Sequence, residues 1–250
     1  MRLPALALAL LPLSIGAPVT VHLAGDSTMA TKRADRRPET GWGELLPHHL
    51  DSTRAVVRNH AANGRSTRSF IAEGRWQALV DSLRPGDWVL VQFGHNDESP
   101  AKGDRYAPPP EFTRNLRRFV DDVRARRATP VLLTPVVRRR FAGDGTLVDT
   151  HGEYPDLVRA VAAERGVVLV DAERDTRAIV QRLGPDSSRA LFLHLAPGAH
   201  VNYPQGVADD THFNERGAAA VAELVVRRLR ESRQPIADFL AGARPRVQKR

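Results

Sequence analysis

The sequence predicts an α/β protein built in three layers, with helices covering both faces of a five-stranded parallel sheet. Two observations support this fold class. Short apolar runs bounded by turn residues alternate along the chain with segments of helical periodicity. Strands separated by helices form right-handed crossovers, which place the strands parallel in one covered sheet. Because no internal repeat or linker interrupts this alternation, we expect one domain over residues 18–240.

Five apolar runs end at turn residues and are expected to be the strands. They cover residues 19–24, 55–59, 88–93, 130–134 and 167–170. Helices are expected where apolar residues recur every three or four positions, as Phe112, Leu116 and Phe119 do. These helices cover residues 75–83, 111–126, 154–165 and 214–230. The proline-rich segment 98–110 is expected to be a long loop.

The composition excludes several kinds of chemistry. The chain has no cysteine, so it can form no disulfide, thiolate metal site or cysteine nucleophile. Its formal net charge of +8 leaves two interpretations open, a solvated basic surface or attraction to an acidic substrate. The basic residues are scattered among acids, without an aromatic-rich basic strand or zinc-finger spacing, so we expect no nucleic-acid partner.

The two ends of the chain differ from the rest. Residues 1–17 contain Arg2, an apolar stretch and then small residues, a pattern typical of a secretory signal peptide. The segment is too short to predict a membrane span. We therefore expect a secreted, soluble protein, extracellular or periplasmic, that acts as a monomer and has no membrane partner. Residues 241–250 are expected to form a loose basic tail.

Four polar motifs stand where expected elements end or begin. They are "GDS" at 25–27, "NHAANGRST" at 59–67, "FGHND" at 93–97 and "DDTHF" at 209–213. The first three follow the first three expected strands, and the fourth comes just before the last expected helix. Open α/β sheets bind their ligands at the carboxyl ends of the strands, so we expect the motifs to meet in one site.

The motifs contain the residue types that serine-dependent ester hydrolysis requires. A serine hydroxyl becomes a nucleophile when a histidine takes its proton, and that histidine needs an acceptor that fixes its tautomer. Ser27 is the expected nucleophile and His212 the expected base. We expect Asp209 to orient His212, because residues three apart share one face where the loop turns into the last helix. Asp210 is the weaker candidate for this role.

The tetrahedral intermediate needs donors for its oxyanion. We expect these to be the backbone N–H groups of Ser27 and Gly64 and the side-chain amide of Asn96. His95 and Asp97 flank Asn96 and are expected either to contact substrate or to hold the loop.

Other interpretations of the motifs are weaker. Each motif alone could be an ordinary turn or a helix cap. A metal site of Asp97, Asp209 and His212 is conceivable, but no ligand spacing supports it, so we expect neither metal nor cofactor. The order of the four motifs therefore favours a serine esterase.

Taken together, the motifs resemble the SGNH hydrolase (GDSL-like esterase) superfamily and, within it, the rhamnogalacturonan acetylesterase family. The resemblance runs from about residue 19 to residue 230. Its further blocks are "GWG" (41–43), "NGRSTRSF" (63–70), "QFGHND" (92–97), "TPVVRR" (134–139), "DTHGEYPD" (149–156) and "DDTHFNERGA" (209–218). Asn63 departs from the pattern, because many relatives carry a second glycine there. His151 lies in one of these blocks, as a cleft residue that could bind substrate or as a structural histidine.

The resemblance implies a flavodoxin-like α/β/α sandwich and a metal-independent triad of Ser27, His212 and Asp209. It also implies removal of acetyl groups from pectic polysaccharide, especially its rhamnogalacturonan backbone, through an acetyl-enzyme. The expected partner is thus an acetylated polysaccharide or oligosaccharide. Two alternatives stay open: an esterase or lysophospholipase of the same scaffold that acts on other acyl esters, and a non-catalytic carbohydrate-binding protein.

Overall fold

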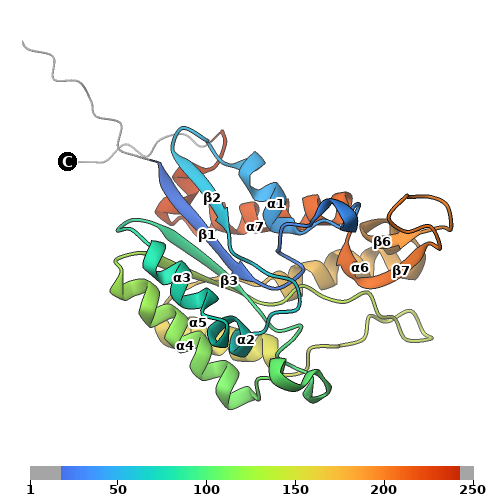
Figure 1. Ribbon diagram of the computed structural model, residues 1–250, viewed down its shortest axis with the longest axis horizontal. Helices are drawn as coiled ribbons and strands as arrows, with labels where there is room; N and C mark the ends of the chain where they lie inside the picture. The colour runs from blue at the N-terminus through green and yellow to red at the C-terminus, as the bar shows by residue number, and fades with distance from the viewer. Residues whose placement is uncertain (1–17, 243–250) are drawn as a thin grey trace, which may run out of the picture.

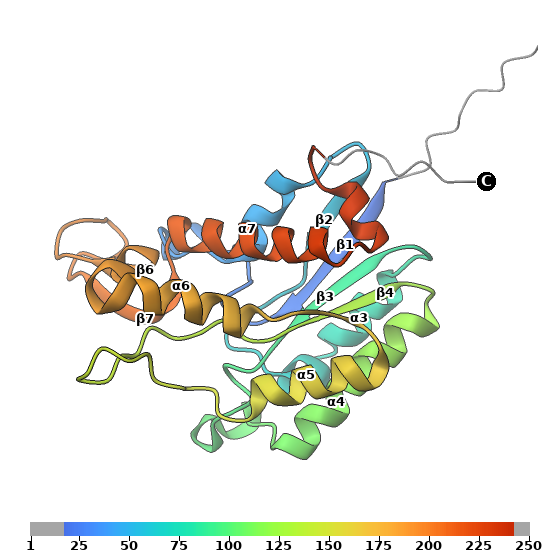
Figure 2. The ribbon, with the colours of Figure 1, turned by 180° about the vertical axis from the view of Figure 1, so that it is seen from behind.

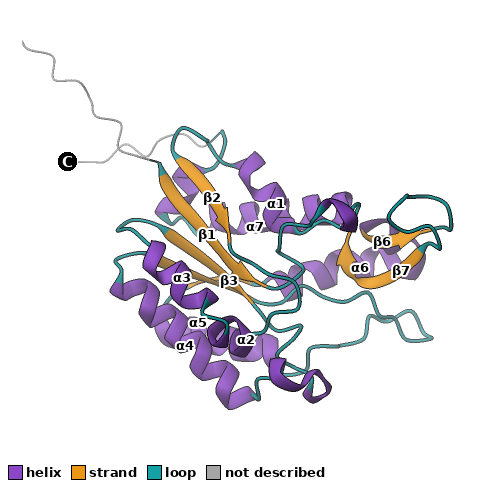
Figure 3. Ribbon diagram, in the orientation of Figure 1, coloured by secondary structure: helices purple, strands orange, loops and turns teal. Residues whose placement is uncertain are grey.

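A computed structural model describes residues 18–242 and contains a five-stranded parallel sheet with strand order β2-β1-β3-β4-β5 (Figures 1 and 3). The strands are β1 (Val19–Gly25), β2 (Ala55–Asn59), β3 (Trp88–Gln92), β4 (Thr129–Leu133) and β5 (Val168–Val170). This is the flavodoxin-like order, so the predicted fold class is confirmed. The predicted signal peptide, 1–17, and residues 243–250 of the predicted tail lie outside the described residues.

Helices cover both faces of this sheet. One face carries α2 (Thr67–Ala72), α3 (Arg75–Ser82), α4 (Pro109–Ala125) and α5 (Tyr154–Arg165). The other carries α1 (Trp42–Leu45), α6 (Ala172–Ser187) and α7 (Glu215–Glu231), which Figure 2 shows from behind. Short 3₁₀ helices complete the chain: η1 (Ala34–Arg36), η2 (Leu46–His49), η3 (Pro100–Arg105), η4 (Ser188–Leu191) and η5 (Pro235–Phe239). Within the described ranges, no helix is both long and apolar enough to cross a membrane.

Alternation along the strands builds two separate cores. Successive side chains of a strand point to opposite faces of its sheet. In β3, Trp88 and Leu90 pack under α1 and α7, whereas Val89 and Val91 pack under α3 and α4. All five residues of β3 are buried, as expected for a central strand covered on both sides.

A second, smaller sheet was not predicted. Strands β6 (Phe192–Leu195) and β7 (Val207–Phe213) pair antiparallel beside the main sheet (Figure 1). Phe192 pairs with Phe213, but the next residue, Leu193, pairs with Asp209, so residues 210–212 bulge out of the ladder. The expectation that Asp209 and His212 share a helical turn at the start of α7 is therefore wrong. Both lie in β7, Asp209 in the ladder just before the bulge and His212 within the bulge.

The strand ends place three of the four motifs together. Gly25 pairs with Gln92, so β1 and β3 end level with each other, and β2 lies on the other side of β1. Strand order reverses at β1, where chain connections leave the sheet in opposite directions and open a crevice. Ser27, Gly64 and Asn96 all follow the carboxyl ends of these three strands.

The close contact between α7 and η4 allows a test of how the smaller sheet is held. Gly217 lies in the first turn of α7, and a Cβ built there would be 1.9 Å from the carbonyl oxygen of Leu191. Alanine in place of helical glycine usually stabilises a protein by about 1 kcal/mol. Here we expect Gly217→Ala to destabilise the fold by about 1–3 kcal/mol, because α7 must move off η4. Chemical denaturation measures the change, and a stabilised variant would contradict this packing.

Candidate active site

The turn after β1 presents Ser27 at the carboxyl end of the sheet. The Asp26 carboxylate accepts hydrogen bonds from the Thr28 N–H, at 2.9 Å, and from its hydroxyl, at 2.8 Å. Asp26 is fully buried, and although burial opposes it, His95 and the Thr28 donors lower the pKa of Asp26 to about 2. Asp26 thus shapes the turn, while Ser27 remains accessible from the cavity described below.

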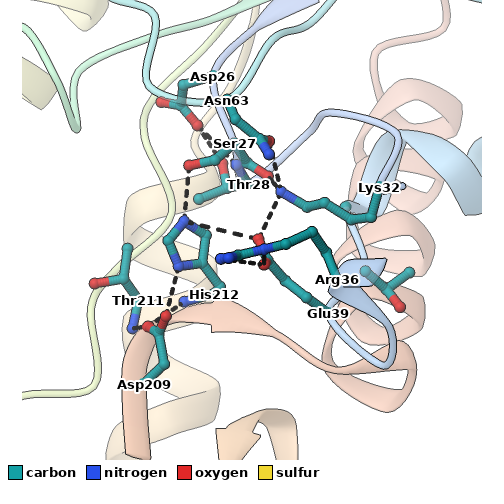
Figure 4. A network of polar contacts seen from close by, with 12 residues as sticks. Asp26, Ser27, Thr28, Lys32, Arg36, Glu39, Asn63, Asp209, Thr211 and His212 are labelled. Carbon is teal, nitrogen blue, oxygen red and sulfur yellow. Dashed lines mark hydrogen bonds and ion pairs between the residues drawn. The ribbon is translucent and has the colours of Figure 1, made fainter. Parts of the chain in front are cut away.

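Figure 4 shows a hydrogen-bonded chain that runs from Ser27 through His212 to Asp209. The Ser27 Oγ lies 2.9 Å from Nε2 of His212, and Nδ1 of His212 lies 2.7 Å from Oδ2 of Asp209. The other carboxylate oxygen of Asp209 accepts the N–H groups of Thr211 and His212. Although burial opposes it, bonding to His212 and to these N–H groups lowers the pKa of Asp209 to about 2, so the carboxylate stays ionised.

Asp210, the weaker candidate for orienting His212, faces elsewhere. Its carboxylate contacts Arg139 Nη1 at 2.6 Å and His194 Nε2 at 2.8 Å. The bulge in β7 thus turns two successive aspartates in different directions, and Asp209 is the one that meets the histidine.

The three expected oxyanion donors border one cavity. Gly64 has φ +74°, a backbone conformation that suits glycine. The Asn96 amide donates to the Arg65 carbonyl at 3.0 Å and its oxygen accepts from Lys102 Nζ at 3.3 Å. These two bonds fix which end of the amide is the donor, and its second N–H is left for a ligand. Ser27, Gly64, Asn96 and His212 all line the same cavity of about 330 Å³.

A larger cavity, of about 610 Å³, lies at the opposite edge of the sheet. It is bordered by the amino ends of β4 and β5 together with residues such as Arg124 and Gln234. It contains none of the candidate catalytic residues, so size does not identify the active site here.

His95, Asp97 and His151, the candidate substrate-binding residues, take different positions. His95 lines the cavity, and its Nε2 has no hydrogen-bond partner among the described residues. Its Nδ1 is 3.2 Å from Asp26 without hydrogen-bond geometry, and burial lowers the pKa of His95 to about 4, which keeps the ring neutral. His95 is therefore a neutral residue of the cavity wall whose two ring nitrogens are buried.

Asp97 and His151 are buried behind the cavity and do not line it, so the expectation of substrate contact finds no support in their positions. Asp97 accepts the N–H and hydroxyl of Thr67 at the start of α2, at 2.8 and 2.6 Å, while burial raises its pKa to about 7. The His151 ring contacts Glu98 at 2.6 Å and the Val136 carbonyl at 2.8 Å. Both side chains hold loops together. Within residues 18–242, no three His, Asp or Glu side chains gather as a metal site would require.

Sequence reasoning missed two lysines at this site. The described chain has only Lys32 and Lys102, and both reach the active-site turns, whereas arginine provides the other long cationic side chains. Lys32 donates to the Ser27 carbonyl and to the side-chain oxygen of Asn63, the residue that departs from the family pattern. The rarity of lysine was a usable signal, because an ammonium is a compact charge that guanidinium does not replace.

Residues 23–220 match the GDSL-like Lipase/Acylhydrolase family, so the chain belongs to this family and is a serine ester hydrolase. It is 42% identical over 223 residues to the rhamnogalacturonan acetylesterase RhgT of Bacillus subtilis, covering 89% of this chain and 94% of that protein. It is 33% identical over 221 residues to YesY, a probable rhamnogalacturonan acetylesterase of the same organism, covering 88% and 96%. Among solved structures, the Bacillus subtilis protein YxiM has a TM-score of 0.73 at 28% identity, over 86% of this chain and 57% of that one. The resemblance inferred from the motifs is confirmed.

The divergence of the two aspartates gives a test with a built-in control. We expect Asp209→Asn to lower kcat for a short aryl acetate by about 10³- to 10⁴-fold, because an amide cannot stabilise the imidazolium. Asp210→Asn makes the same chemical change one residue along and should keep kcat near the parent value. Steady-state hydrolysis, followed by the released phenolate, measures both. Equal losses in the two variants would contradict the assignment of Asp209.

Proposed function

We propose that this chain is a secreted carbohydrate esterase that removes acetyl groups from pectic polysaccharide of the rhamnogalacturonan type. The observation that carries the proposal is the hydrogen-bonded chain Ser27–His212–Asp209 at a cavity that three oxyanion donors border. The names of the two relatives support the substrate class. The apolar character of residues 1–17 supports export, and we propose the monomer as the acting unit.

Acylation begins when the Ser27 Oγ attacks the acetyl carbonyl carbon and its proton passes to Nε2 of His212. Asp209 stabilises the imidazolium that forms. Negative charge develops on the carbonyl oxygen, which the N–H groups of Ser27 and Gly64 and the Asn96 amide stabilise. The C–O bond to the sugar then breaks, the sugar oxygen takes the proton from His212, and an acetyl-enzyme remains.

Deacylation repeats these steps with water in place of the serine. The neutral His212 takes a proton from the attacking water, and the same three donors stabilise the second tetrahedral intermediate. Collapse of the intermediate breaks the bond to Ser27 and releases acetic acid, which ionises to acetate. His212 returns its proton to the Ser27 Oγ, which restores the resting enzyme.

The lining of the cavity favours a carbohydrate over a long acyl chain. Every residue that borders it is polar or glycine, so an alkyl chain would find no apolar wall. A lysophospholipase would require such a wall. This observation favours an acetylated sugar over the alternative acyl-ester substrates.

The charges at the cavity favour an acidic polysaccharide. Four cationic side chains border it, and one carboxylate, Glu39. Arg36 is paired with Glu39 and Arg138 with Glu98, but Lys102 and Arg105 have no carboxylate partner within residues 18–242. Arg105 is exposed. It lies beside the turn that carries Gly64, because a Cβ built on Gly64 would be 3.1 Å from Nη1 of Arg105. An excess of positive charge there attracts a uronate carboxylate through long-range attraction that salt weakens.

Replacement of the proposed nucleophile tests the function directly. We expect Ser27→Ala to reduce acetate release from acetylated rhamnogalacturonan fragments by at least about 10³-fold while the melting temperature stays near the parent value. Released acetate is quantified in an enzyme-coupled assay. Retained activity would refute the serine mechanism. A parent enzyme that prefers long acyl esters would refute the carbohydrate assignment.

Replacement of Arg105 is a separate test of substrate choice. We expect Arg105→Gln to lower kcat/KM for acetylated galacturonate-containing fragments by about 10-fold, because it removes a charge-assisted contact, and to leave hydrolysis of a neutral aryl acetate nearly unchanged. Arg182→Gln, on the exposed side of α6, removes the same charge away from the cavity and serves as the control. The difference between the two variants should shrink in high salt. Equal losses on both substrates would contradict the role of Arg105 in recognising acidic sugars.

A further inference from the structure

A buried lysine joins the two turns that carry the nucleophile and an oxyanion donor. The Lys32 side chain is fully buried, and its ammonium has three acceptors (Figure 4). They are the Ser27 carbonyl oxygen, the Asn63 side-chain oxygen at 2.9 Å and a carboxylate oxygen of Glu39 at 2.8 Å. An ammonium has three N–H donors, so every donor of Lys32 is used.

Two of the three acceptors of Lys32 belong to the turns of the candidate site. Ser27 supplies the nucleophile, and Asn63 directly precedes Gly64. One ammonium therefore fixes the turn after β1 against the turn after β2, across the space where a substrate carbonyl must sit. Asn63 itself is exposed, so its bond to Lys32 is not needed to fill the core.

Glu39 connects this pair to the histidine. Its side chain is 1% exposed, and its carboxylate also receives Arg36 at 3.2 Å. The same oxygen that faces Lys32 lies 4.0 Å from Nε2 of His212, the nitrogen that faces Ser27. A backbone hydrogen bond holds Glu39 next to His212. The N–H of Thr40, the residue after Glu39, donates to the carbonyl of Phe213, the residue after His212, at 2.9 Å.

We propose that Lys32 is a positioning residue: through its bonds to Ser27 and Asn63 it sets the distance between the nucleophile and the Gly64 oxyanion donor, and Glu39 ties this distance to His212. Burial lowers the pKa of Lys32, and the adjacent Glu39 carboxylate opposes that shift. The inference rests on the proposed serine mechanism and adds a residue outside the triad and the oxyanion donors.

The role predicts a loss in the chemical step rather than in substrate binding. We expect Lys32→Met to lower kcat for an aryl acetate by about 100-fold with little change in KM, because a displacement of about 1 Å between reacting groups costs about this much. The second-order rate of inactivation by diisopropyl fluorophosphate should fall in parallel, since its phosphoryl oxygen occupies the oxyanion site. Arg33→Met is the matched control: it removes an exposed cation next to Lys32 in the same loop, whose ion pair is with Asp35 and not with Glu39 or either turn, and it should retain both rates.

Asn63→Ala keeps the test informative if Lys32→Met fails to fold, because Asn63 is exposed. We expect this variant to lower kcat by about 10-fold at an unchanged melting temperature, and to have much less effect in the Lys32→Met background, since linked residues are not additive. Full activity of Asn63→Ala, a loss confined to KM, or additive effects in the double variant would overturn the proposal. The proposed function is tested separately, by Ser27→Ala, so the two can fail independently.

Discussion

The active site depends on one hydrogen bond, between the Ser27 Oγ and Nε2 of His212, which joins residues 185 positions apart in the chain. Ser27 stands at the end of the parallel sheet, whereas His212 stands in the bulge of a separate two-stranded sheet. A contact of 2.9 Å between two sheets requires that both be held by something rigid. Helix α7 provides this, because it begins directly after β7 and packs its apolar face on the main sheet. The core thus sets the geometry of the reacting atoms.

Buried charges, in addition to packing, hold the turns of the candidate site in place. Asp26, Lys32 and Glu39 are all at most 5% exposed, and removing such groups from water costs several kcal/mol each. A buried ion pair contributes little net stability, but it has few alternative arrangements and so fixes directions. Here two of the three charges bond to a turn of the candidate site: Asp26 to Thr28, directly after Ser27, and Lys32 to Ser27 and Asn63, while Glu39 pairs with Lys32. These residues are best understood as fixing geometry at a cost in stability.

Periodicity was sufficient to predict the main sheet, because buried parallel strands such as Trp88–Gln92 are continuous apolar runs that end at turns. Strand β7 carries no such signal: its residues are mostly polar, and its register shifts where it pairs with β6 across the loop 196–206, which periodicity does not predict. The pairing of Asp209 with His212 was anticipated, although by the wrong local geometry. The burial of Asp97 and His151 and the path that brings Lys32 to Ser27 depend on loop packing, which local patterns do not encode.

The proposed oxyanion donors and the cations without a carboxylate partner among the described residues come from different segments around this cavity. The proposed oxyanion donors are the N–H groups of Ser27 and Gly64 and the Asn96 amide, whereas Lys102 and Arg105, the cations without a carboxylate partner in the described chain, belong to η3. This segment is anchored, because the Ala107 N–H donates to the Asp97 carbonyl and Tyr154 donates to the Ala107 carbonyl. The Asp97 carbonyl therefore helps to hold the segment that presents Arg105. An anchored loop displays its charges with little loss of entropy on binding. Under the proposed function, the charges of η3 thus select the ester, while Ser27, His212 and Asp209 carry out the reaction.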